Sequence, residues 1–169
     1  MSEHYLLPPR ITDETGQPRR AGFEFEFGNL PIRETAAALH EAVGGRLETI
    51  SPFEAILHDS RLGKLKSTRY RSWLETLGIE FSPGSFGHEV ETNIDNASRA
   101  LIPCEVVTQP IPLQELVTLD TLVQTLNQLG AEGTQHSIVY AFGLHINASL
   151  PSRDSISILR HLQSFLLLH

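Results

Sequence analysis

Two glutamates, Glu24 and Glu26, stand two residues apart in a segment where they alternate with phenylalanines. If the segment from Arg19 to Gly28 is a strand, its three phenylalanines share one face and both carboxylates share the other. Neighbours on one face of a strand are about 7 Å apart, so the two acids can point into one site. The alternative is an amphipathic strand whose glutamates only face water, because any half-buried strand alternates in this way.

Two later segments offer polar side chains with the same alternation. The segment from 101 to 108 reads as a strand that presents Glu105 from one face, and the segment from 143 to 149 presents His145 and Asn147. Hard cations such as Mg²⁺ take oxygen ligands, commonly carboxylates with water and phosphate oxygens, and a histidine widens the choice to Mn²⁺. Carboxylates from neighbouring strands could therefore hold metal ions that clamp a triphosphate.

Each of these residues also has a simpler interpretation. A single histidine such as His145 is more often hydrogen-bonded within a sheet than bound to a metal ion, and Glu105 beside two valines is compatible with a solvent-facing edge. The group His88, Glu89 and Glu91 resembles a metal-binding cluster, but a solvated loop explains it better. The metal hypothesis therefore depends on the three strands lying side by side.

Basic residues in a separate segment could meet a phosphate group. A short strand predicted from 62 to 66 places Lys64 and Lys66 on one face. Arg69 and Arg71 come shortly after it. Ammonium groups can contact phosphates as point charges and guanidinium groups as forks, but charge runs of this kind usually cover a surface. Both interpretations stay open.

Several familiar catalytic motifs do not occur in the sequence. There is no Walker-type phosphate loop, no Gly-x-Gly-x-x-Gly segment and no Gly-x-Ser-x-Gly nucleophile elbow. The single cysteine, Cys104, lies in an apolar run and is expected to be buried rather than nucleophilic. If ATP is used, a sheet and its metal ions must therefore hold it.

The composition is that of one folded domain. The chain has 169 residues, of which 40% are hydrophobic and 20% charged, and its formal net charge is −7. It has no basic tract, which argues against binding to nucleic acid or to an anionic membrane. A single cysteine excludes an internal disulfide, which fits a reducing compartment. No signal peptide is recognisable, and no apolar stretch reaches the roughly 20 residues of a membrane span. A cytoplasmic location is therefore expected.

The remaining periodicity predicts helices between the strands. Residues 1–18 are expected to form an irregular arm, followed by a single domain at 19–169. A first helix is predicted between Pro31 and Gly44. A second runs from Leu113 towards a cap at Gly130. The other expected elements are a strand at 46–50, a helix at 70–77, and extended segments at 88–93 and 137–142.

A last helix is predicted after Pro151, with Ser152 as its N-cap. Five of its apolar residues are expected to face inward: Ile156, Leu159, Leu162, Phe165 and Leu166. The helix ends on an apolar run without a cap. The sequence is therefore expected to be the first part of a longer domain, or one whose apolar end is covered by a partner chain in an oligomer.

Three motifs occur in a defined order along the chain. The first is Arg-Ala-Gly-Phe-Glu-Phe-Glu-Phe at 20–27, the second is Glu-Val-Val-Thr-Gln-Pro at 105–110 before a long helix, and the third is Phe-Gly-Leu-His-Ile-Asn at 142–147. Together they resemble the amidoligase family, a group of carboxylate–amine ligases related to glutamine synthetase and glutamate–cysteine ligase. The resemblance covers the chain from Arg19 to its end.

The resemblance implies an α+β fold, in which a curved, mainly antiparallel sheet carries helices packed on its outer face, as in a glutamine-synthetase-like catalytic domain. It implies that the concave face binds ATP and Mg²⁺, with Mn²⁺ as an alternative. The implied reaction phosphorylates a substrate carboxylate with ATP and then lets an amine displace the phosphate to form an amide. The implied catalytic and metal-binding residues are Glu24, Glu26, Glu105 and His145, and the candidates for holding the nucleotide are Lys64, Lys66 and Asn147.

Two features depart from the family pattern. After Lys66 the chain continues into Ser67-Thr68-Arg69, where a further acid is expected, so one metal ligand stays unassigned. Relatives also continue past residue 169 with further helices and basic residues. The alternative to a ligase of small-molecule or peptide substrates is therefore a non-catalytic nucleotide- or peptide-binding remnant, or a structural domain whose acids are only solvated.

Overall fold

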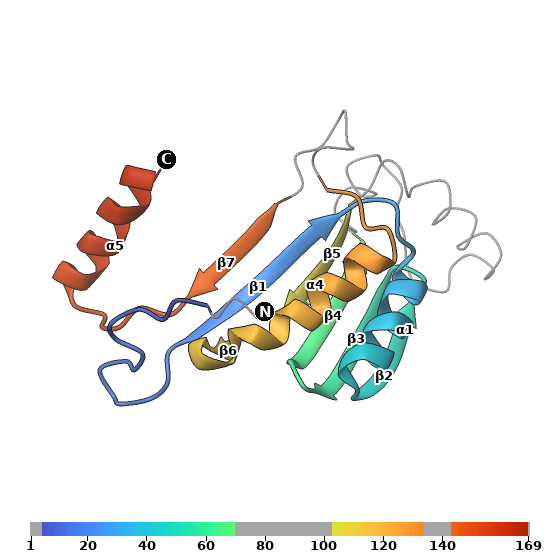
Figure 1. Ribbon diagram of the computed structural model, residues 1–169, viewed down its shortest axis with the longest axis horizontal. Coiled ribbons are helices and arrows are strands. Elements are labelled where there is room, and N and C mark those ends of the chain that lie inside the picture. Colours follow the sequence, from blue (N-terminus) through green and yellow to red (C-terminus); the bar gives the residue numbers. More distant parts are fainter. Residues whose placement is uncertain (1–4, 70–102, 134–142, 169) are drawn as a thin grey trace.

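The computed structural model describes residues 5–69, 103–133 and 143–168 (Figure 1). In these parts helices and strands are mixed around one open antiparallel sheet, as the sequence predicts. In chain order the elements are β1 (Arg20–Phe27), α1 (Ile32–Val43), β2 (Arg46–Ser51), β3 (Glu54–Ser60), β4 (Gly63–Arg69), β5 (Cys104–Thr108), β6 (Ile111–Pro112), the 3-10 helix η1 (Leu113–Thr118), α4 (Leu119–Gln128), β7 (Leu144–Ala148) and α5 (Ser155–Leu168).

The strand β1 is where the three sequence motifs meet. The sheet follows the order β2-β3-β4-β5-β1, and each of its pairings is antiparallel. The strands β6 and β7 also pair with β1. The second and third motifs, which lie far from the first in the chain, are thus both hydrogen-bonded to it.

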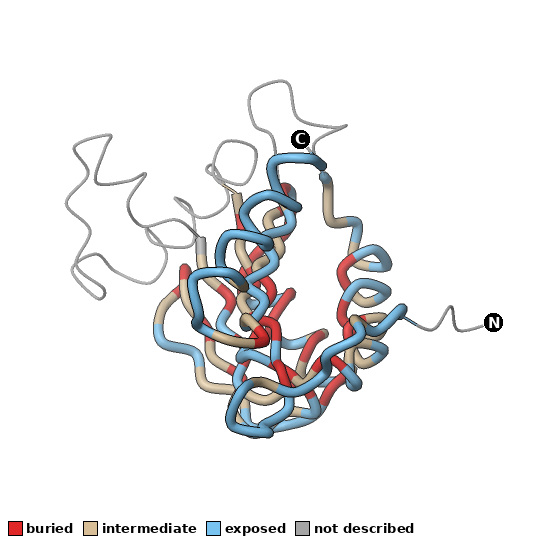
Figure 2. The backbone as a smooth tube through the Cα atoms, turned by 90° about the vertical axis from the view of Figure 1, so that its left-hand side faces the viewer, coloured by how far each residue is buried: buried red, intermediate tan, exposed pale blue. Residues whose placement is uncertain are grey.

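Alternation along the strands gives the sheet one apolar and one polar face. Phe23 and Phe27 of β1 are buried on the apolar face together with Val106 of β5 and Leu65 of β4. The helices α1 and α4 cover this face and share one hydrophobic core with it (Figures 1 and 2). The buried residues that these helices contribute include Ile32, Leu39, Leu119, Leu122 and Leu126.

Helix α1 follows Pro31 and ends at Gly44, as the sequence predicts. The Pro31 carbonyl accepts hydrogen bonds from the Thr35 amide and hydroxyl, at 3.0 and 2.9 Å. Both glycines after the helix have positive φ, 72° at Gly44 and 96° at Gly45, a conformation that favours glycine. The two residues turn the chain directly into β2.

Gly45 is expected to tolerate no side chain. A Cβ atom there would lie 2.4 Å from the carbonyl oxygen of His58, whereas a Cβ on Gly44 meets nothing within 4 Å. We expect Gly45→Ala to lower the free energy of unfolding by about 2–4 kcal/mol, because the left-handed φ and the backbone clash act together. The matched control, Gly44→Ala, should lose only about 1–2 kcal/mol. Urea unfolding compares the two variants, and equal losses would contradict the close approach of β3 to Gly45.

Two elements differ from the sequence-based prediction. The helix predicted from Leu113 begins as the 3-10 helix η1, and regular α-helix starts only at Leu119. The Thr118 hydroxyl donates to the Glu115 carbonyl at 2.6 Å, a three-residue spacing that suits the tighter 3-10 turn. Strand β3 was not predicted, because Ile56 on its polar face obscures the alternation. The predicted elements at 70–77, 88–93 and 137–142 lie outside the described residues.

The N-cap of α5 is Asp154 rather than the predicted Ser152. The Ser157 amide donates to Asp154 Oδ1 at 2.8 Å, whereas the Ser152 hydroxyl accepts a bond from the Asp154 amide at 3.3 Å. Hydrogen bonds with Ser152, and from the amide and hydroxyl of Ser157, hold the pKa of the Asp154 carboxyl below its ordinary value. The helix therefore begins at Ser155, two residues later than an N-cap at Ser152 would place it.

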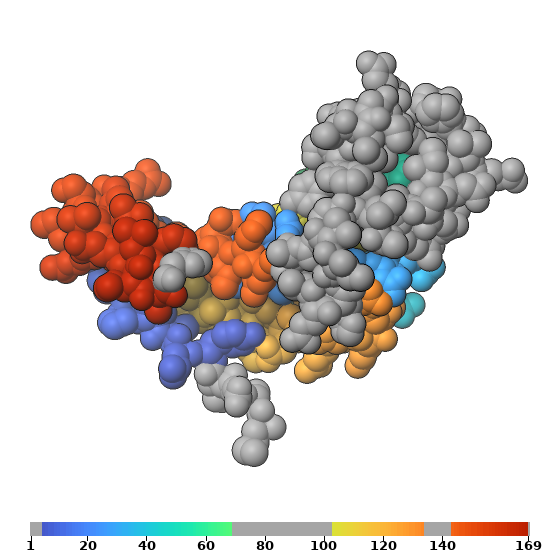
Figure 3. Space-filling view, turned by 90° about the horizontal axis from the view of Figure 1, so that it is seen from above, coloured from blue at the N-terminus to red at the C-terminus, as the bar shows by residue number. Residues whose placement is uncertain are grey.

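The apolar residues of α5 do not face inward as predicted. The helix stands beyond β7 at one end of the molecule, away from α1 and α4, and none of its residues is buried (Figures 1 and 3). Leu162 and Phe165 are 53% and 57% exposed. Self-association through this helix and a cytoplasmic location stay predictions. In the three described stretches, no helix is long and apolar enough to cross a membrane.

Candidate functional site

The polar face of the sheet carries the residues that the sequence singled out. Residues directly opposite each other in an antiparallel pair point to the same face. Glu24 of β1 lies opposite His145 of β7, and Glu26 lies opposite Glu105 of β5. Asn147, two residues after His145, points the same way. The structure thus brings all four predicted metal ligands and Asn147 onto one face of three adjacent strands, and their roles stay predictions.

Glu24 is held by side chains of β7. His145 Nδ1 lies 3.3 Å from one of its carboxylate oxygens, and Asn147 Nδ2 donates to the other at 2.5 Å. The side chain of Glu24 is 29% exposed and that of His145 is 57% exposed. The two contacts fix the orientation of the carboxylate while solvent still reaches part of it.

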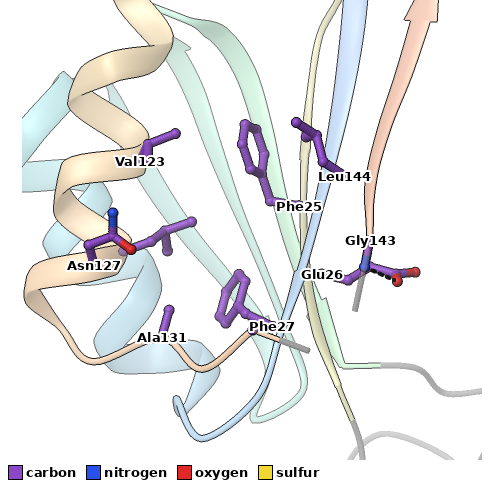
Figure 4. A pocket seen from close by; sticks show the side chains of 10 residues that line it. Phe25, Glu26, Phe27, Val123, Asn127, Ala131, Gly143 and Leu144 are labelled. Carbon is purple, nitrogen blue, oxygen red and sulfur yellow. Dashed lines mark hydrogen bonds between the residues drawn. The ribbon is translucent and has the colours of Figure 1, made fainter. Parts of the chain in front are cut away.

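Glu26 is held by the backbone just before β7. The Gly143 amide donates to Glu26 Oε2 at 3.1 Å, on the side of β1 away from α4 (Figure 4). The Glu26 amide donates to the Gly143 carbonyl at 3.0 Å. In an antiparallel sheet the amide and carbonyl of one residue both point to the same neighbouring strand, and those of Glu26 point to β7. Glu26 and Glu105 therefore form a pair without backbone hydrogen bonds between β1 and β5. Side chains approach most closely in such pairs, so this register brings two carboxylates together.

The acidic and imidazole groups form two pairs rather than one cluster. Within residues 5–69, 103–133 and 143–168, no three histidine, cysteine, aspartate or glutamate side chains are close enough to hold one metal ion. Mg²⁺ typically keeps several waters and takes one or two carboxylates together with substrate phosphates, whereas structural zinc needs four protein ligands. Two ligands from each pair are compatible with that coordination of Mg²⁺, and the metal and nucleotide stay predictions.

Lysines on β4 lie next to the acidic groups. Lys66 lies opposite Val107 of β5, which in turn lies opposite Glu24, so Lys66 shares the polar face. Lys64, two residues earlier, points the same way. Lys66 Nζ lies 3.0 Å from Glu54 Oε1 of β3, with both side chains partly exposed. Exposed ion pairs contribute little stability, so a phosphate could displace Glu54 at small cost.

A second polar group on the same face was missed by the sequence analysis. His58 Nε2 of β3 lies 2.7 Å from Glu48 Oε2 of β2, and Arg46 Nη1 lies 4.0 Å from the same oxygen. This group and Glu54 could only have been found after β3 was recognised as a strand. The available signal was the alternation of His58 with the buried Leu57.

An apolar cavity lies on the opposite side of the sheet, between β1 and α4 (Figure 4). Its volume is about 250 Å³. Phe25, Phe27 and Val123 point into it, and Leu144 of β7 lies at its border. Glu26 and Gly143 also line it, although the Glu26 carboxylate turns toward Gly143 and away from the phenylalanine rings (Figure 4). Cys104 is buried on this apolar side, as predicted, and its thiol donates to the Leu30 carbonyl at 3.0 Å.

A comparison with known families decides what kind of protein carries this polar face. The family model described as "Putative amidoligase enzyme" matches residues 17–169. The chain belongs to this amidoligase family. No curated protein and no solved structure matches the chain. The matched range of the amidoligase includes β1, β5 and β7, the strands that gather the polar side chains.

Proposed function

We propose that this amidoligase joins a carboxylate to an amine at its polar face, using ATP and Mg²⁺ and forming an acyl phosphate. The observation that supports this is the register of β1 with β5 and β7, which gathers three glutamates and one histidine in two pairs. Phosphoryl transfer depends on positioning and on neutralisation of charge, so metal ligands beside lysines suit it. The substrates would be a small-molecule or peptide carboxylate and an amine.

The two pairs would each hold a metal ion together with phosphate oxygens. One site would use Glu24 and His145, where the imidazole would also accept Mn²⁺. The other would use Glu26 and Glu105, which lie directly opposite each other on β1 and β5 and offer carboxylate oxygens, the ligands that Mg²⁺ prefers. Bound Mg²⁺ would offset the charge that develops on the transferred phosphoryl group.

Residues around the pairs would position the nucleotide and the ligands. Lys64 and Lys66 would contact phosphate oxygens from β4, which β5 and β1 separate from β7. Asn147 donates to Glu24, so it would orient that carboxylate rather than contact the nucleotide itself. We also infer a glutamine-synthetase-like sheet, which the antiparallel strand order and the packing of α1 and α4 on a single face of the sheet support.

The reaction would consist of two steps. A carboxylate oxygen of the first substrate attacks the γ-phosphorus of ATP, and the bond to ADP breaks. The amine nitrogen then attacks the acyl carbon, phosphate leaves with the bonding electrons, and the nitrogen loses a proton. One sheet face with acids and lysines would serve both steps. The phosphoryl group would stay in one place while its bond to ADP is replaced by a bond to the substrate carboxylate, and that bond is then broken by the amine.

The test measures ADP release from Mg²⁺·ATP with N-acetylated amino acids as the carboxylates and amino-acid amides as the amines, each set supplied alone and then both together. Release that requires both groups, and that is lost in Glu24→Gln but kept in the matched control Glu34→Gln on α1, supports the ligase. Calorimetric binding of Mg²⁺·ATP without release would identify a non-catalytic remnant. An absence of binding would leave a structural domain with solvated acids.

A further inference from the structure

Arg19 is a buried cation immediately before β1. It is only 7% exposed. Its Nε and Nη2 donate to the Ser149 carbonyl at 3.0 and 2.8 Å, and its Nη1 donates to the Arg10 carbonyl at 2.8 Å. Burial of a charge costs free energy unless the group is hydrogen-bonded. Here the hydrogen bonds tie together three parts of the chain: the N-terminal arm, the start of β1 and the end of β7.

The contact with Ser149 is part of a larger connection between β7 and β1. Ser149 directly follows β7, and its amide donates to the Arg20 carbonyl at 2.8 Å. In return the Arg20 amide donates to the Ser149 hydroxyl at 2.9 Å. The backbone and side chain of Ser149 are therefore fixed against β1, and Arg19 adds charge-assisted bonds to the remaining carbonyl.

The packing of β7 does little to fix its position. All five of its residues are exposed, and in the described chain it pairs with β1 alone. Leu144 and Ile146 are 52% and 58% exposed. A strand that is not fixed by burial of one face is prone to slip in register, and a slip of one residue turns each side chain to the other face. Such a slip would remove His145 and Asn147 from Glu24.

We propose that Arg19 is a positioning residue that locks the register of β7 and thereby holds His145 and Asn147 against Glu24. The catalytic meaning of this inference rests on the proposed function, whereas its structural basis does not. Arginine suits the task because its guanidinium group is a rigid, planar fork. Two of its nitrogens donate to the Ser149 carbonyl and the third to the Arg10 carbonyl, a geometry that a lysine ammonium group does not provide. Burial lowers the pKa of Arg19, and the nearby Arg10 charge adds to this, but a guanidinium remains protonated at neutral pH.

Amide hydrogen exchange measured by NMR tests the lock on the full chain. In Arg19→Met, the β7 amides that pair with β1 should exchange at least about tenfold faster, because bonds from a charged donor are lost. Amides of α1 and α4 should change much less. The matched control is Arg20→Met, since the Arg20 guanidinium donates to the Pro110 carbonyl at 3.1 Å instead of to Ser149. Equal acceleration in β7 and the helices, or no acceleration in β7, would overturn the proposal.

Mn²⁺ added together with ATP supplies a second readout that a purely structural role would not change selectively. Bound Mn²⁺ should broaden the NMR signals of Glu24, Glu26 and His145 in the wild type. In Arg19→Met the broadening, which falls steeply with distance from the ion, should weaken at His145 relative to Glu26. If Arg19→Met does not fold, Arg19→Lys takes its place, with a smaller effect in the same residues expected. A wild type without any broadening would contradict the proposed metal site, while hydrogen exchange would still decide the role of Arg19.

Discussion

Replacing Glu26 with glutamine is expected to abolish the response of the protein to Mg²⁺·ATP while leaving the fold intact. The variant keeps the size of the side chain but removes one of the two charges that face each other across β1 and β5. We expect ADP release to fall by about 100-fold or more, the range for losing one preorganised electrostatic group. In the wild type, Mg²⁺·ATP at 100 times its Kd should raise the free energy of unfolding by about 2.7 kcal/mol. In Glu26→Gln this gain should vanish. Thermal unfolding with and without Mg²⁺·ATP measures it.

Three further variants make this result specific. Glu105→Gln should behave like Glu26→Gln, because the proposed metal ion needs both partners of the pair. Asn147→Ala should be milder, at about 10- to 100-fold, because Asn147 orients Glu24 and does not replace it. Glu34→Gln on α1 should change nothing. If Glu26→Gln keeps the full stabilisation by Mg²⁺·ATP while Glu105→Gln loses it, the two residues do not share an ion.

Much of the site could be predicted because local patterns determine which way each side chain points. The alternation of phenylalanine and glutamate in β1 leaves a single register in which the rings face the core, and the structure has that register, with Phe23 and Phe27 buried and Phe25 partly buried. Glu105 follows the same rule on β5, where Cys104 and Val106 are buried on the other face. Pro31 and Gly44 bound α1 for equally local reasons, since proline suits a helix start and glycine accepts positive φ.

The rest depends on contacts between distant segments, which no local pattern contains. The alternation of β7 says that His145 and Asn147 share a face, but only its pairing with β1 places them on Glu24. The ion pair of Lys66 with Glu54 required knowledge of β3, which Ile56 obscured. The apolar stripe of α5 predicted burial, but burial needs a surface to pack against, and within the described chain the helix has no buried residue.

Phe27→Ala is expected to lower the free energy of unfolding by about 3–5 kcal/mol, the usual range for deleting a buried ring. Phe27 is only 4% exposed and lies between the sheet and α4, beside the cavity of about 250 Å³. Removal of the ring would enlarge this cavity, and the cost grows with the volume that the surroundings cannot refill. Because small domains are stable by only about 5–15 kcal/mol, this loss is a large fraction of the total.

Guanidinium unfolding and calorimetric titration together show whether the two faces of β1 act independently. Phe27→Leu retains most of the ring volume and should lose less than about 1.5 kcal/mol, so it separates volume from the aromatic ring itself. Phe27 lies on the face opposite the carboxylates, so the folded Phe27→Ala protein should bind Mg²⁺·ATP with an unchanged Kd. Glu26→Gln should do the reverse, keeping stability and losing binding. If both variants are folded and Phe27→Ala weakens binding as much as Glu26→Gln, the division of β1 into a structural face and a metal-binding face is wrong.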